Sequence, residues 1–127
     1  MGFISVLIAA AAAWAFGAIW YMVLAKPWMA ANDLKEEDID RSDKVPFIVS
    51  FVCLILVAGM MRHILAMGGI EELGKGAVTG LGLGIFVAAP WIVLNNRFSG
   101  RPNALSMIDG GYATIGCVII GAVLTMF

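Results

Sequence analysis

The sequence is poor in charged residues, and this shortage excludes an ordinary soluble domain. Only 13% of the 127 residues are charged, whereas 61% are hydrophobic. Soluble domains carry about a quarter charged residues, which cover their water-facing surface. The lipid bilayer is therefore the expected solvent and partner of this chain. Because the net charge is only −1, we expect no nucleic-acid partner.

Cysteine and histidine are also scarce, which argues against a disulfide framework and a metal centre. Cys53 and Cys117 lie inside apolar runs, whereas structural disulfides usually link cysteines in loops. With one histidine, His63, and no Cys-x-x-Cys pair, a zinc site is excluded. Met60 and Met67 share a helix face with His63 and are soft enough to bind copper(I). Packing explains such residues more simply, so we expect no metal.

Catalytic motifs are absent from the chain. It contains no Ser/His/Asp set, no His-Glu-x-x-His, no Gly-x-Ser-x-Gly and no phosphate-binding loop. No carboxylate lies in the middle of an apolar run, although proton-coupled carriers usually have one at membrane depth. We therefore expect that the protein is not an enzyme and has no cofactor.

Long apolar runs are the dominant positive feature. They cover residues 3–25, 46–67, 76–94 and 107–127, and a helix of about 20 residues crosses the bilayer core. The alternation typical of membrane strands is absent. The first run lacks a basic flank and exceeds a signal-peptide core in length, so we expect it to be retained. The sequence predicts one domain, residues 1–127, folded as an all-α integral membrane protein with an antiparallel four-helix transmembrane bundle.

The cations are distributed unevenly between the loops. The first and third loops hold Lys26, Lys35, Arg41, Lys44, Arg97 and Arg101. The opposite side holds Arg62 and Lys75, in addition to the α-amino group. The positive-inside rule then places the first and third loops in the cytoplasm and both termini in the periplasm. Trp20, Tyr21 and Trp28 would anchor that cytoplasmic end at the headgroup level.

The first loop contains the acidic stretch "NDLKEEDIDRSD". It lacks the glycine and the terminal glutamate of a calcium-binding loop. The spacing of Asp33 and Glu36 resembles a helix start instead. We therefore expect a short cytoplasmic surface helix after Trp28.

Small residues recur at helical spacing in the last two runs. The third run contains Gly76, Gly80, Gly84 and Ala88, and the fourth contains Gly110, Thr114, Cys117 and Gly121. Membrane helices associate through such faces because small side chains let the backbones approach closely. The third run should therefore pack tightly against the fourth or the first. Pro90 removes one hydrogen bond from the third helix and is expected to kink it.

The stretch "RFSGRPNALSMIDGGY", residues 97–112, is a polar island among these apolar runs. Ser106 and Asp109 have the spacing of a capping box at the start of the fourth helix. Asp109 is also expected to pair with Arg97 or Arg101, since a pair at the interface is stronger than one in water. Tyr112 should lie one turn deeper and contact Trp20 or Tyr21. Two consecutive glycines precede Tyr112, and they are unfavourable in a helix unless something must approach closely.

Two segments resemble the signatures of a known family. "GAIWYMVLAKPWM" (17–29) resembles the first signature and "FSGRPNALSMIDGGY" (98–112) the second. The family is a group of small bacterial membrane proteins called domain of unknown function 1761. The resemblance implies four helices in a bacterial cytoplasmic (inner) membrane and no established activity. The matching positions are Gly17, Trp20, Tyr21, Trp28, Arg101, Pro102, Leu105, Ile108, Asp109, Gly111 and Tyr112.

Both signatures should converge at the cytoplasmic face, where Arg97 joins them in one candidate cluster. Three functions remain open. The first is a non-catalytic subunit or scaffold that packs into a homo-oligomer or a larger membrane complex. The second is a binder or carrier of a small or lipid-like molecule in a cytoplasm-facing pocket. The third, a membrane enzyme, has the least support.

Overall fold

The computed structural model describes residues 2–40 and 42–127, and this part of the chain contains helices and no strand. Arg41, one of the cations counted above, lies outside the described residues. The helices are α1 (Gly2–Val23), α2 (Ala25–Ala31), the 3₁₀ turn η1 (Glu36–Asp38), α3 (Val45–Met67), α4 (Leu73–Leu83), the π turn η2 (Gly84–Ala88), α5 (Ala89–Phe98) and α6 (Asn103–Leu124). Four segments are long and apolar enough to cross a membrane: α1, α3, the continuous Leu73–Phe98 and α6.

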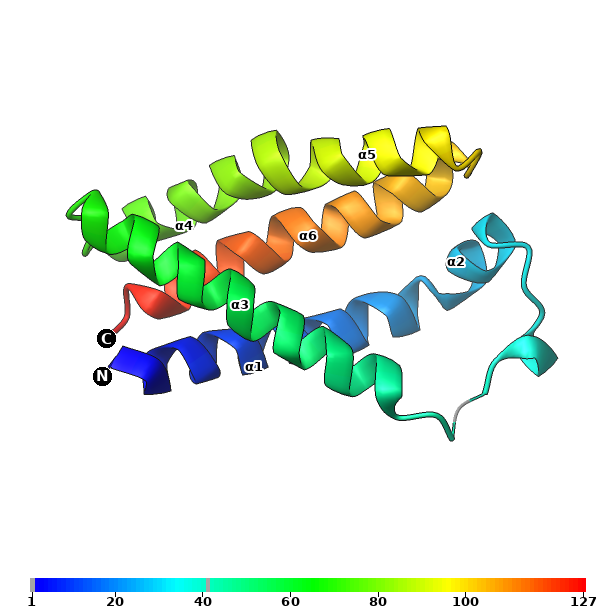
Figure 1. Cartoon of the computed structure of the whole chain (residues 1–127), viewed down its shortest axis with the longest axis horizontal. Coiled ribbons are helices and arrows are strands. Elements are labelled where there is room, and N and C mark those ends of the chain that lie inside the picture. The colour runs from blue at the N-terminus through cyan, green and yellow to red at the C-terminus, as the bar shows by residue number, and fades with distance from the viewer. Residues whose placement is uncertain (1, 41) are drawn as a thin grey trace.

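These four segments run back and forth, as Figure 1 shows. The start of α1, the α3–α4 connection and the end of α6 lie at one end, while α2 and the α5–α6 connection lie at the other. Helix α6 contacts α1, α3, α4 and α5. Helices α1 and α6 bury much more of their surface than α3 and the α4–α5 segment. The pair α1 and α6 therefore forms the centre of the fold.

The core between α1, α3 and α6 is made of small residues facing larger ones. Ala9, Ala10 and Ala13 of α1 are fully buried, and they pack in one cluster with Met61 of α3 and Ile120 of α6. Alanine at this spacing brings the backbones close without a cavity, which is how helices gain packing energy in lipid. The alanine-rich first helix is thus suited to a central position.

The glycines of α4 lie directly against α6. A Cβ atom built on Gly84 would lie 2.5 Å from the Cα of Thr114, and one on Gly80 would overlap the carbonyl oxygen of Cys117. A Cβ atom built on Gly76 would lie 2.5 Å from the carbonyl oxygen of Gly121. These residues belong to the two small-residue series that the sequence singled out. Their contact is so close that no larger side chain fits without moving a helix.

The π turn η2 changes the register of this contact. The N–H of Ala89 bonds to the carbonyl of Gly84, five residues earlier, immediately before Pro90. A π turn adds one residue to the helix, and here it lies where the ring of Pro90 would crowd a regular α-helix. Ala89 therefore faces Gly110, with its Cβ 3.6 Å from a Cβ built there. The residue that contacts Gly110 is therefore the one after Ala88, with which the expected series ends.

Two expected helix starts are also corrected. Helix α6 begins at Asn103, four residues before the predicted 107, because Pro102 adopts an extended conformation (ψ 153°) and precedes the first turn. The short helix after α1 contains Trp28 and ends at Ala31, so it lies before the acidic stretch. Asp33 has φ 53°, which ends helical geometry there, and the acidic residues form only the single turn η1.

Candidate functional site

Three hydrogen bonds join α1 to α6 near the end that carries α2. The Tyr21 hydroxyl donates to Asp109 Oδ1 at 2.6 Å, and the indole N–H of Trp20 donates to the carbonyl of Ile108 at 3.0 Å. The Tyr112 hydroxyl donates to the carbonyl of Ala13 at 3.2 Å. We call Trp20, Tyr21, Asp109 and Tyr112 the aromatic–carboxylate cluster. Its members come from opposite ends of the sequence.

Helical spacing explains how these side chains meet. Asp109 and Tyr112 lie three residues apart in α6 and so share one face. The ring of Tyr21 contacts the ring of Tyr112 edge-on, with centroids 5.4 Å apart. The ring of Phe16 stacks on that of Tyr112, with centroids 6.2 Å apart. Tyr21 therefore contacts α6 twice, with its ring on Tyr112 and with its hydroxyl on Asp109.

The consecutive glycines before Tyr112 are explained by what surrounds them. Gly110 faces Ala89, as described above. A Cβ on Gly111 would lie 3.0 Å from the Trp20 ring. A Cβ on Gly17 would lie 2.7 Å from the Tyr112 hydroxyl oxygen. Gly17 and Gly111 thus each make room for an aromatic side chain of the partner helix.

The arginines of the third loop bind amides and not Asp109. The Arg101 guanidinium donates to the side-chain oxygen of Asn32, and the Asn32 amide in turn donates to the carbonyl of Trp28 at 2.9 Å. Arg97 donates to the side-chain oxygen of Asn103 at 3.3 Å. The predicted pairing of Asp109 with an arginine is therefore wrong. The carboxylate is already occupied by Tyr21, which is held in place by α1.

The predicted capping box is wrong as well. Pro102 occupies the N-cap position of α6, and no side chain caps the helix. Ser106 lies inside the first turns, where its hydroxyl accepts a hydrogen bond from the Asn96 amide at 3.2 Å. The earlier start of the helix shifts Ser106 and Asp109 away from the cap. They connect α6 to α5 and to α1 instead.

The candidate cluster is brought together only in part. Gly17, Trp20, Tyr21, Asp109, Gly111 and Tyr112 form the contacts between α1 and α6. The ring of Trp28 packs edge-on to Tyr21, with centroids 6.4 Å apart. Arg101 and Pro102 lie at the connection before α6, and Arg97 belongs to the contact between α5 and α6. The sequence did not predict Phe16 and Asn32, because the residues that they contact on or before α6, Tyr112 and Arg101, are more than 60 residues away in the chain.

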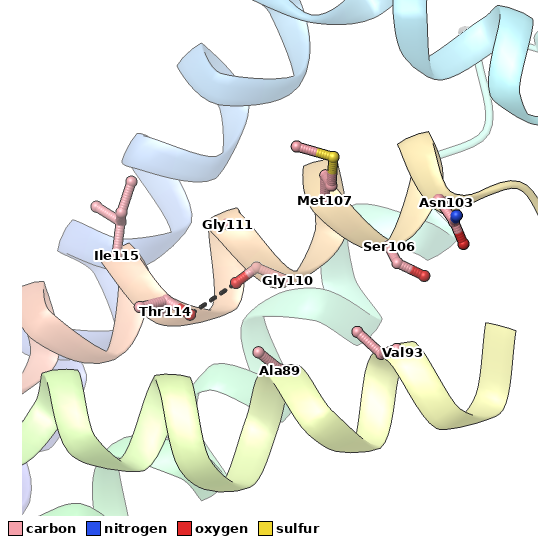
Figure 2. A pocket seen from close by; sticks show the side chains of 9 residues that line it. All are labelled: Ala89, Val93, Asn103, Ser106, Met107, Gly110, Gly111, Thr114 and Ile115. Atoms are coloured by element: carbon pink, nitrogen blue, oxygen red, sulfur yellow. Dashed lines mark hydrogen bonds between the residues drawn. The ribbon is translucent and has the colours of Figure 1, made fainter. Parts of the chain in front are cut away.

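A separate groove lies between α5 and α6 and has a volume of about 470 Å³. Ala89 and Val93 form the α5 wall, and residues 103–115 contribute one side of α6 (Figure 2). The Thr114 hydroxyl is bonded to the Gly110 carbonyl at 2.8 Å, so the groove offers mostly apolar surface. The groove is open along one side and is not an enclosed cavity.

The described part of the chain contains no cluster of acidic or other metal-binding side chains. No group of three or more His, Cys, Asp or Glu side chains is placed to hold a metal ion among these residues. In the first loop, hydrogen bonds from the hydroxyl and the backbone N–H of Ser42 hold the pKa of the Asp40 carboxyl below its usual value. That carboxylate stabilises a local turn and is fully solvated.

Comparison with known proteins gives one result. No curated protein and no solved structure matches the chain. A family model does match, over residues 4–125, which includes both signature segments and, apart from the first two residues of α1, all four long apolar helices. The chain therefore belongs to the family described as protein of unknown function (DUF1761).

Proposed function

We propose that the protein is a non-catalytic integral membrane subunit or scaffold. Its four long helices form an antiparallel transmembrane bundle that assembles as a homo-oligomer or within a larger membrane complex. The observation that carries this proposal is that the polar groups of the aromatic–carboxylate cluster form their hydrogen bonds within the chain and leave none directed at a ligand. Tyr21, Trp20 and Tyr112 each donate a hydrogen bond within the chain, and Asp109 accepts one.

A closed cluster differs from the usual binding or catalytic site. Substrate sites present donors and acceptors that converge on an open space. In the described part of this chain, every buried side-chain nitrogen and oxygen has a hydrogen-bond partner. The polar groups of Trp20, Tyr21, Asp109 and Tyr112 are therefore accounted for by hydrogen bonds within the chain. Their role in this proposal is to hold α1 against α6.

The outer faces support assembly with other chains. Helix α3 and the α4–α5 segment expose many large apolar side chains, which lipid or protein must cover. Three glycines on these elements, Gly59, Gly74 and Gly82, would have open space around an added Cβ. Outward small residues let a second helix approach closely in a bilayer. These faces are the proposed contact surfaces.

Native mass measurement after extraction in mild detergent tests this function. We expect a mass of more than one chain, either a defined homo-oligomer or a complex with a stoichiometric partner. A monomer with no partner would contradict the scaffold proposal. A monomer that retains a stoichiometric small molecule would favour the second candidate, a binder or carrier. The α5–α6 groove is the observation that favours this alternative.

We further propose that the protein lies in a bacterial cytoplasmic membrane with both termini in the periplasm. The six-to-two distribution of cations supports this orientation, by the positive-inside rule. Its test is labelling of single cysteines in intact cells with a membrane-impermeant maleimide, after Cys53 and Cys117 are replaced by alanine. Ser42→Cys and Ser99→Cys should remain unlabelled, whereas Glu71→Cys should react. The reverse pattern would invert the proposed orientation.

A further inference from the structure

The α5–α6 groove has a cation at one end. Ala89, Val93 and Arg97 follow each other at four-residue intervals and so lie on one face of α5. Ala89 and Val93 line the groove, and Figure 2 shows both pointing toward α6. Arg97 continues this row, and its bond to Asn103, another lining residue, places its guanidinium beside the groove. The groove is thus apolar along its length and positively charged at the loop end.

The charge of Arg97 is not neutralised by the chain. In the described residues Arg97 bonds to the neutral Asn103 amide and forms no ion pair. The next arginine, Arg101, also bonds to a neutral amide, that of Asn32. A guanidinium at the membrane surface binds phosphate oxygens through several N–H groups at once. The guanidinium of Arg97 is therefore free to pair with an anion at the membrane surface.

The position of the groove also matches a lipid. It lies between two segments that are long and apolar enough to cross a membrane, and it is open along one side, where acyl chains would have access to it in a bilayer. Met107, Val93 and Ile115 supply apolar contacts, and the glycines Gly110 and Gly111 make the α6 wall shallow. An extended hydrocarbon chain fits such a surface better than a bulky polar solute does.

We propose that this groove is a specific site for one anionic phospholipid, with an acyl chain between α5 and α6 and the headgroup phosphate on Arg97. The site goes beyond the proposed scaffold function and does not depend on it. A monomeric protein would bind the lipid equally well. Attraction between an anionic lipid and one interfacial arginine is worth about fivefold in affinity. The same lipid with a zwitterionic headgroup should bind correspondingly less.

The test uses delipidated protein in a neutral detergent and counts bound lipids by native mass spectrometry. Dioleoylphosphatidylglycerol should bind about fivefold more tightly than dioleoylphosphatidylcholine, which has the same chains. Inorganic phosphate at matched concentration should neither bind nor raise the melting temperature. Equal binding of the two lipids would overturn the proposal. An equal effect of phosphate would overturn it too, because the groove would then contribute nothing.

Two variants locate the site. Arg97→Gln should remove the preference for phosphatidylglycerol, and Val93→Phe should weaken both lipids by filling the groove. Arg62→Gln, which removes a cation at the other end of the molecule, and Val49→Phe on α3 are the matched controls and should bind as the parent does. Arg97, Arg62, Val93 and Val49 are all exposed. Each variant's melting temperature without lipid verifies its fold. If the controls lose as much binding as the groove variants, the proposed site does not exist.

Discussion

Gly80→Leu is expected to destabilise the protein by about 3 kcal/mol or more and to prevent recovery of the folded form. A Cβ atom at this position overlaps the carbonyl oxygen of Cys117, which belongs to the backbone of α6 and cannot rotate away. Overpacking usually costs about 1–3 kcal/mol. Here the cost should exceed that range, because α4 and α6 must separate along their whole contact.

The matched control lies in the same helix. Gly82 has no atom within 4 Å of an added Cβ, so Gly82→Leu should leave the monomer as stable as the parent. The measurement is the free energy of unfolding by sodium dodecyl sulfate in mixed micelles. Similar stability of the two leucine variants would show that the α4–α6 contact is not as close as described.

Tyr21→Phe should be the second most damaging of the proposed changes, at about 1.5–3 kcal/mol. The substitution removes the only described donor to the Asp109 carboxylate, and hydrogen bonds to charged groups contribute about this much. Tyr112→Phe removes a hydroxyl bonded to a neutral carbonyl, so its cost should be only about 0.5–1.5 kcal/mol. The same unfolding titration compares the two. A larger loss for Tyr112→Phe would contradict the assigned hydrogen bonds.

Periodicity and hydropathy were sufficient to predict the four long apolar helices, and the family resemblance is confirmed over residues 4–125. Each of these features depends on many residues, all of which favour the same structure. The glycine series in α4 could be identified for the same reason, since each member repeats one turn after the last. A single substitution would not have hidden either pattern.

Features that depend on one residue were predicted less well. The π turn places Ala89 against Gly110, and no periodic pattern shows where such a turn occurs. The capping box was misplaced because Pro102 sets the start of α6 four residues early. The charges of the third loop predict an arginine as the partner of Asp109, whereas the hydroxyl that binds it belongs to Tyr21, 88 residues earlier.

The candidate site shows the same division. The two signature segments meet at one end, where the first ends α1 and the second begins α6 (Figure 1). Which side chains pair could not be derived from the sequence, because Trp20 and Tyr112 bond to backbone carbonyls. Every residue has a backbone carbonyl, so the sequence does not indicate which carbonyl accepts the hydrogen bond. Only the consecutive glycines before Tyr112 indicated a close approach, and Gly111 does face the Trp20 ring.

The central claim is that the aromatic–carboxylate cluster holds α1 against α6, and a double-mutant cycle between Tyr21 and Asp109 tests it most directly. The free energy of unfolding is measured for the parent, Tyr21→Phe, Asp109→Ala and the double variant. If the two side chains stabilise the fold through each other, the double variant should be only slightly less stable than the worse single variant, with a coupling energy of about 1.5 kcal/mol or more. Additive losses, with a coupling energy below about 0.5 kcal/mol, would contradict the account.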